Sequence, residues 1–82
     1  MAGYHLKEIE KGEYGQFSKV QEEFNELLDA REQKSSIMEL VELSDLYGAI
    51  ESYIENKYNI GMDELEKMSD ITKRAFRSGH RK

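Results

Sequence analysis

Hydrophobic residues recur at steps of three and four along three stretches of the chain, a spacing that predicts three amphipathic helices. The first stretch covers residues 16–33 and the second 37–58, while the third follows a break at Asn59 and Gly61 and ends near residue 77. In the second stretch, apolar residues occur on most sides of the helix instead of forming one narrow stripe. This pattern predicts a central helix that is covered on most sides. The stripe of the first stretch consists of Phe17, Val20, Phe24, Leu27 and Leu28.

Pairs of residues with helix-capping spacing stand before the second and third stretches. Ser36 and Glu39 are three residues apart, as in a capping box, and so are Asp63 and Glu66. These pairs predict where the second and third helices begin.

The two ends of the chain differ from the helical stretches. Residues 1–14 contain aromatic and charged residues without a helical period, which predicts an irregular N-terminal arm. Residues 71–82 contain several Lys and Arg residues and no acidic residue, so we predict a basic C-terminal segment. Cations near a helix C-terminus ordinarily interact with the helix dipole.

The composition favours a small all-α protein that associates with itself. The 82 residues include no proline and no cysteine, and without cysteine the chain can form neither disulfides nor thiolate metal sites. A chain of this length forms one domain, 1–82, whose core has marginal stability. We therefore predict an all-α fold in which a short helical chain completes a four-helix-type bundle by oligomerisation, as a homodimer or homotetramer.

The charge and hydropathy of the chain exclude two classes of partner. The net charge of −5 argues against binding to a nucleic-acid polymer, because proteins of that class are usually basic. No stretch approaches the roughly 18 apolar residues of a membrane span, and the polar N-terminus lacks the apolar core of a signal peptide. We therefore expect a cytoplasmic protein with no membrane partner.

Two acidic clusters, within residues 22–26 and 42–45, are the most informative feature of the sequence. Lys and Arg are absent from residues 20–30 and again from 35–56. This absence predicts that no local ion pair neutralises the carboxylates of either cluster. A positively charged group from elsewhere must then neutralise these carboxylates.

The helical positions of the carboxylates favour a divalent cation as that partner. Glu23 borders the apolar stripe of the first predicted helix, and Glu26 lies farther toward solvent. Glu42 and Asp45 share a face with apolar residues, where burial of an unpaired carboxylate costs several kcal/mol. Mg²⁺ and Mn²⁺ prefer oxygen ligands and would offset this cost.

Less specific interpretations of the charged residues stay open. Glu22, Glu26 and Asp29 are also typical of an ordinary solvated helix face. The sequence has no phosphate-binding loop, so a bound phosphate would depend on metal and basic side chains. Some of the basic residues are equally typical of helix ends. The candidate substrate-binding residues are Lys19, Lys57, Lys73, Arg74 and Arg77.

The two clusters form the pattern EExxE, from Glu22 to Glu26, followed by ExxD, from Glu42 to Asp45. In this order they resemble the motifs of the MazG-like all-α nucleoside triphosphate pyrophosphohydrolases, and the resemblance covers about residues 19–49. It implies Mg²⁺-dependent hydrolysis, with Mn²⁺ as a substitute, between the α and β phosphates of a nucleoside triphosphate. The products would be the monophosphate and pyrophosphate.

The resemblance also implies roles for individual residues. Glu22 and Glu23 would be catalytic, with Glu22 supporting the site or orienting the attacking water. Asp70 stands where family members often carry Asn before the basic residues that hold the nucleotide. The implied metal ligands are Glu23, Glu26, Glu42 and Asp45.

Two other functions are compatible with the sequence. The chain has the features of a non-catalytic helical oligomerisation or protein-interaction module, with an acidic face that docks a basic partner. A relative of the pyrophosphohydrolases that binds nucleotide or metal without chemistry would have the same motifs.

Overall fold

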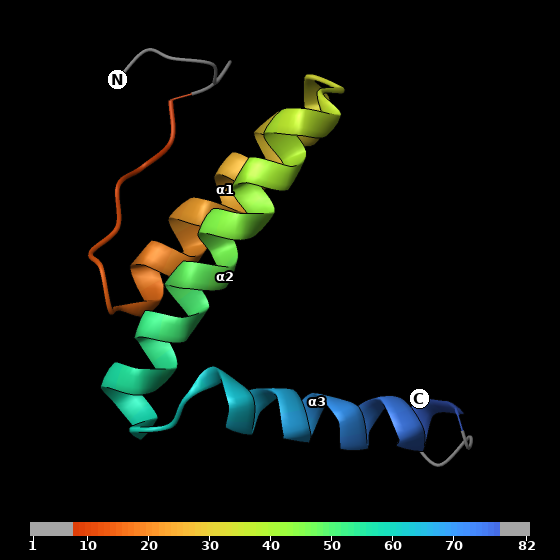
Figure 1. Ribbon diagram of the computed structural model, residues 1–82. Helices are drawn as coiled ribbons and strands as arrows, with labels where there is room; N and C mark the ends of the chain where they lie inside the picture. Colours follow the sequence, from red (N-terminus) through yellow and green to blue (C-terminus); the bar gives the residue numbers. More distant parts are fainter. Residues whose placement is uncertain (1–7, 78–82) are drawn as a thin grey trace.

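The structure is a computed structural model that describes residues 8–77, and within this range it contains three α-helices and no strand. The helices are α1 (Phe17–Glu32), α2 (Ser36–Tyr58) and α3 (Met62–Arg77) (Figure 1). The predicted all-α class and the three helical stretches are confirmed. Residues 8–13 have no regular structure, as predicted for the arm, whereas residues 1–7 and 78–82 of the predicted terminal segments lie outside the described range.

Both predicted capping pairs are displaced from the observed helix starts. Ser35, not Ser36, caps α2, and its Oγ accepts a hydrogen bond from the Met38 backbone N–H at 3.2 Å. Ser36 is instead the first residue of the helix. At the start of α3, the Gly61 N–H donates to Glu64 Oε1 at 2.9 Å, which is half of a capping box two residues earlier than predicted.

Left-handed residues terminate the first two helices. Lys34 follows the last turn of α1 with a φ of 59°, and Asn59 ends α2 with a φ of 57°. The Asn59 N–H donates to the Glu55 carbonyl at 3.1 Å and so satisfies one of the last carbonyls of α2. The turn at Lys34 is short, so α1 and α2 form an antiparallel hairpin (Figure 1).

The contact between α1 and α2 contains few apolar side chains. The buried apolar residues are Leu27 and Ala30 on α1 and Ala49 and Ile54 on α2. Two of these four residues are alanines, whose small side chains allow close packing of helices. The largest fully buried side chains of the described residues, those of Glu42 and Asp29, are carboxylates rather than hydrocarbons.

Much of the apolar surface of α2 is exposed, although the sequence predicts coverage on most sides. Ile37, Leu40 and Tyr47 are all exposed, and α3 extends away from the hairpin instead of packing along it (Figure 1). One copy of the chain therefore does not supply the predicted coverage, and the four-helix-type bundle stays a prediction. No helix within residues 8–77 is long and apolar enough to cross a membrane.

Residues 8–16, which we call the strap, run back along α1 before the chain enters that helix (Figure 1). The Glu13 N–H donates to Ser18 Oγ at 3.0 Å, and Asn56 Nδ2 donates to the Gly15 carbonyl at 3.0 Å. Gly12 passes so close to the backbone of Ser18 that a Cβ atom has no space there. The strap is therefore attached to both helices of the hairpin.

Candidate metal centre

Four carboxylates converge between α1 and α2, and we call them the carboxylate centre. Each helix contributes two residues spaced by three, which places each pair on one face of its helix. Antiparallel packing brings the two faces together, so that one carboxylate oxygen from each residue lies within 4.8 Å of the others. The four residues are Glu23, Glu26, Glu42 and Asp45, the same four that the resemblance implies as metal ligands.

The centre extends from the interior of the hairpin to its surface. Glu42 is completely buried and Glu23 is 5% exposed, whereas Glu26 is half-buried and Asp45 is exposed. The floor of the site is thus shielded from water while its opening is accessible. Oxygen ligands arranged in this way suit a hard divalent cation that keeps part of its water shell.

Burial and neighbouring carboxylates raise the pKa of Glu26. Its pKa is raised from 4.5 to about 8, first because burial disfavours the charged form and then because Glu23 and Glu42 lie beside it. At neutral pH, Glu26 therefore retains a proton that reduces the repulsion among the carboxylates. Glu23 Oε1 is buried and accepts no hydrogen bond within the described part of the chain. A cation bound at the centre would provide a favourable electrostatic partner for this oxygen.

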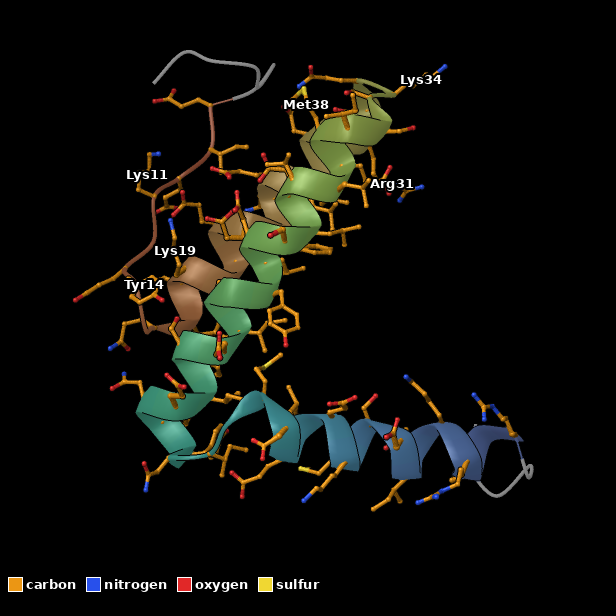
Figure 2. All side chains as sticks on the ribbon, viewed as in Figure 1. Lys11, Tyr14, Lys19, Arg31, Lys34 and Met38 are labelled. Atoms are coloured by element: carbon orange, nitrogen blue, oxygen red, sulfur yellow. The ribbon has the colours of Figure 1, made fainter. Side chains whose placement is uncertain are left out.

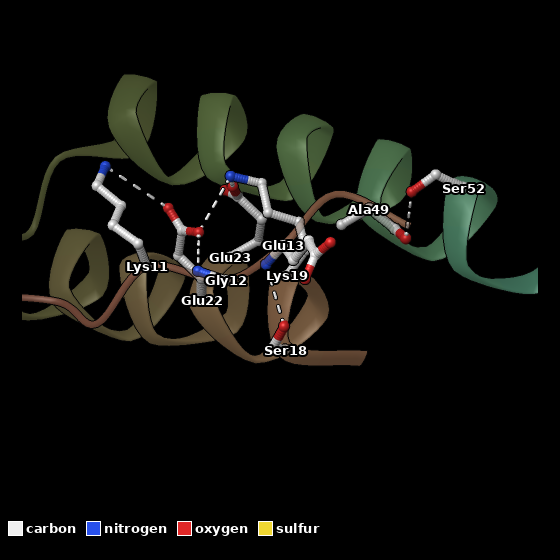
Figure 3. A network of polar contacts seen from close by, with 9 residues as sticks. All are labelled: Lys11, Gly12, Glu13, Ser18, Lys19, Glu22, Glu23, Ala49 and Ser52. Atoms are coloured by element: carbon white, nitrogen blue, oxygen red, sulfur yellow. Dashed lines mark hydrogen bonds and ion pairs between the residues drawn. The ribbon is translucent and has the colours of Figure 1, made fainter. Parts of the chain in front are cut away.

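The prediction that no local ion pair neutralises the acidic clusters is wrong for the first cluster. Lys19 Nζ lies 3.1 Å from Glu22 Oε1 and 3.1 Å from Glu23 Oε2 (Figure 3). Lys19 is one residue outside the Lys-free interval, and spacings of three and four place its side chain on the same helix face as both carboxylates. The predicted contact between Lys19 and substrate stays untested.

Glu22 lies beside the carboxylate centre and is directed toward the strap. Its Oε1 accepts a hydrogen bond from the Gly12 N–H at 2.8 Å, and Lys11 Nζ lies 3.8 Å from its Oε2. Figure 2 shows Lys11 and Lys19 on the same side of α1. Burial alone would raise the pKa of Glu22, but the Gly12 hydrogen bond and Lys19 lower it below its ordinary value. This carboxylate is held by partners within the chain, and its predicted catalytic role stays a prediction.

The interpretation of the first cluster as a solvated face is contradicted by burial. Glu22 is 3% exposed and Asp29 only 1%, while Glu26 is half-buried. Asp29 Oδ2 accepts a hydrogen bond from Gln33 Nε2 at 2.9 Å. The sequence reasoning did not single out Asp29 as buried, although its spacing of seven from Glu22 places both residues on one helix face.

The remaining basic candidates do not reach the carboxylate centre within one chain. Lys57 lies over the rings of Tyr53 and Tyr58, twelve residues beyond Asp45, or about 18 Å farther along α2. Lys73, Arg74 and Arg77 are on α3, which leads away from the hairpin (Figure 1). In a single chain, these basic residues are placed as ordinary charges near helix ends are, which is the alternative interpretation of the sequence.

Comparisons of the chain with protein-family models, with curated proteins and with solved structures gave no significant match. The resemblance to the MazG-like proteins therefore depends on the motif residues of the sequence and stays a prediction.

Proposed function

We propose that the protein is a Mg²⁺-dependent nucleoside triphosphate pyrophosphohydrolase of the MazG-like type. The observation that carries the proposal is the convergence of Glu23, Glu26, Glu42 and Asp45 at one point between two helices. Two of these four residues are buried, and burial of several carboxylates together is costly unless a cation occupies the site. The order of the motif residues supports this reaction class.

The residues of the carboxylate centre have different proposed roles, which depend on how buried each side chain is. Glu42 and Glu23 form the floor, where they would hold Mg²⁺ or Mn²⁺ from the interior side. Glu26 and Asp45 form the accessible rim, where substrate and water enter. When bound, the metal would screen the triphosphate and lower the pKa of a coordinated water. The oxygen of water would attack the α-phosphorus, and the bond between that phosphorus and the oxygen that bridges it to the β-phosphorus would break. Pyrophosphate would leave with the bridging oxygen, and the proton lost by the water would pass to solvent.

We propose further that the active form is a homodimer or homotetramer. The hairpin buries few apolar residues, while large apolar side chains of α2 and α3 are exposed, including Leu40, Met68 and Ile71. Pairing two hairpins would produce a four-helix bundle and cover such side chains. Because α3 leads away from its own carboxylate centre, basic residues of α3 would contact a bound triphosphate only from a neighbouring copy.

The alternative of an acidic docking face is less consistent with the geometry. A surface that binds a basic partner through charge needs accessible carboxylates. Glu22, Glu23 and Glu42 are buried, and the ammonium group of Lys19 pairs with both Glu22 and Glu23. An oligomerisation role through the exposed apolar residues is compatible with the enzymatic proposal and does not compete with it.

The decisive test measures pyrophosphate release from a panel of ribo- and deoxynucleoside triphosphates, with Mg²⁺ or with EDTA. The test variant is Asp45→Asn, an exposed rim residue whose change is expected to leave the fold intact. The matched control is Asp63→Asn, the same chemical change at an exposed position of α3. We expect Mg²⁺-dependent release that is lost in the rim variant and kept in the control. Release that persists in EDTA, or no release by folded, metal-loaded protein, would overturn the proposal.

A further inference from the structure

The ammonium group of Lys19 already supplies part of the positive charge that a bound metal would supply to the carboxylate centre. Its ammonium group is 3.1 Å from Glu23 Oε2, and Glu23 belongs to the carboxylate centre. The side chain is only 26% exposed, so water screens this ion pair less than it screens a surface pair. One implied metal ligand is therefore partly neutralised from within the chain.

Glu22 and the strap hold Lys19 in this position. Glu22 Oε1 accepts hydrogen bonds from both the Gly12 N–H, at 2.8 Å, and Lys19 Nζ, at 3.1 Å (Figure 3). The Glu22 side chain is 2% exposed, so it has little freedom to turn away. Because the Gly12 N–H and Lys19 Nζ bind the same oxygen of Glu22, the position of the strap and the position of the Lys19 ammonium group are coupled.

We propose that Lys19 is a positioning residue that competes with the metal for Glu23, and that Glu22 and the strap set the strength of this competition. The inference rests on the proposed metal site and adds an internal counter-ion to it. A divalent ion bound to Glu23 would lie within a few ångströms of the ammonium group, and the two cations repel each other. Lys19 therefore keeps the centre ordered without metal and lowers its affinity for metal.

Glu22 acts in the opposite direction from Lys19. It shares the ammonium group with Glu23 and so draws part of that positive charge away from the carboxylate centre. Loss of the Glu22 charge would leave Lys19 paired with Glu23 alone. Competition with the metal would then be stronger, so removing Glu22 and removing Lys19 have opposite expected effects on metal affinity.

The experiment measures Mn²⁺ binding to the full chain by electron paramagnetic resonance, without nucleotide, together with thermal unfolding in EDTA. Lys19→Met is expected to bind Mn²⁺ about tenfold more tightly than wild type and to unfold at a lower temperature in EDTA. Lys19→Arg keeps the charge and is expected to bind Mn²⁺ like wild type. Lys67→Met makes the same change at an exposed position of α3 and is the matched control.

The outcomes separate this inference from the proposed function. Equal or weaker Mn²⁺ binding by Lys19→Met, with binding by wild type intact, overturns the role of Lys19 and leaves the metal site standing. Binding by Lys19→Met alone supports the inference. No binding by any of the proteins overturns the metal site and the inference together.

A second variant covers the case in which Lys19→Met does not fold. Glu22→Gln is expected to weaken Mn²⁺ binding by several-fold, since Lys19 then pairs with Glu23 alone. Unchanged or tighter binding by this variant contradicts the proposal.

Discussion

The Gly12 backbone N–H donates a hydrogen bond to Glu22 Oε1 at 2.8 Å, across ten residues of sequence. This bond joins the strap to α1 at the residue that also holds Lys19. A segment without regular structure is thereby connected to the carboxylate centre through two side chains.

Gly12→Ala is expected to lower the free energy of unfolding by about 2 kcal/mol, in the range for loss of a hydrogen bond to a charged group. The added Cβ has no space against the backbone of Ser18, so the strap must move and Glu22 loses the Gly12 N–H. Urea unfolding measures the change. Glu10→Ala, at an exposed position of the same strap, should leave stability close to that of wild type. Equal stability of the two variants would show that the strap does not depend on this close approach.

The pKa of Glu26 predicts a falling stability of the metal-free protein as pH rises. Because its pKa is raised from 4.5 to about 8 by burial and by Glu23 and Glu42, the folded state binds this proton more tightly than the unfolded state. Its contribution to stability is complete below pH 4.5 and is lost as pH rises through 8. We expect urea unfolding in EDTA to show this decline.

Other shifted groups do not interfere within this pH window. The pKa of Glu22 is lowered, so its contribution is already complete above pH 4.5. The pKa of Lys19 is raised, since its hydrogen bonds to Glu22 and Glu23 outweigh the effect of burial, and its contribution is lost only above pH 10.5. Glu26→Gln should therefore flatten the decline, and Glu66→Gln, at an exposed position, should preserve it. A decline that persists in Glu26→Gln would assign it to another group.

Metal removal should affect stability through Glu42, the fully buried ligand of the centre. Saturation with Mg²⁺ at 100 times its dissociation constant stabilises a folded protein by about 2.7 kcal/mol. We expect the unfolding temperature of wild type to rise with Mg²⁺ and to return to its initial value with EDTA. Glu42→Gln should abolish this rise, whereas Glu55→Gln, at an exposed position of the same helix, should keep it. A rise of wild-type size in Glu42→Gln would place the metal elsewhere.

Self-association should depend on the exposed apolar residues of α3. Ile71 is 59% exposed in the single chain, and a charged residue there would be costly to bury against a second copy. Ile71→Glu is expected to reduce the mass of the wild-type oligomer in sedimentation equilibrium, whereas Lys67→Glu, at an exposed position on the same helix, is expected to leave it unchanged. A monomeric wild-type protein would contradict the proposed oligomer.

Sequence alone was sufficient for the helices and for the composition of the carboxylate centre. Helices depend on hydrogen bonds and side-chain contacts within a few residues, so hydrophobic spacing and breaks such as Asn59 predict them well. The pairs Glu23–Glu26 and Glu42–Asp45 have spacings of three, as other acidic pairs of the chain do, and the resemblance to the MazG-like motifs singled out these four residues. The capping pairs were displaced by a residue or two because several Ser, Gly and Glu residues compete at each helix start.

Only the tertiary structure decided how these local elements meet. The antiparallel contact of α1 with α2 joins the two carboxylate pairs. It buries Glu42 and leaves Asp45 exposed, a difference that spacing within one helix does not specify. The strap depends on a close backbone contact at Gly12, six residues from Ser18, that has no periodic signal in the sequence. The raised pKa of Glu26 depends on burial and on residues of both helices. The sharing of the Lys19 ammonium group between Glu22 and Glu23 depends on its distances to the two carboxylates. Such properties arise from packing in three dimensions, where the energy of a charge depends on everything that surrounds it.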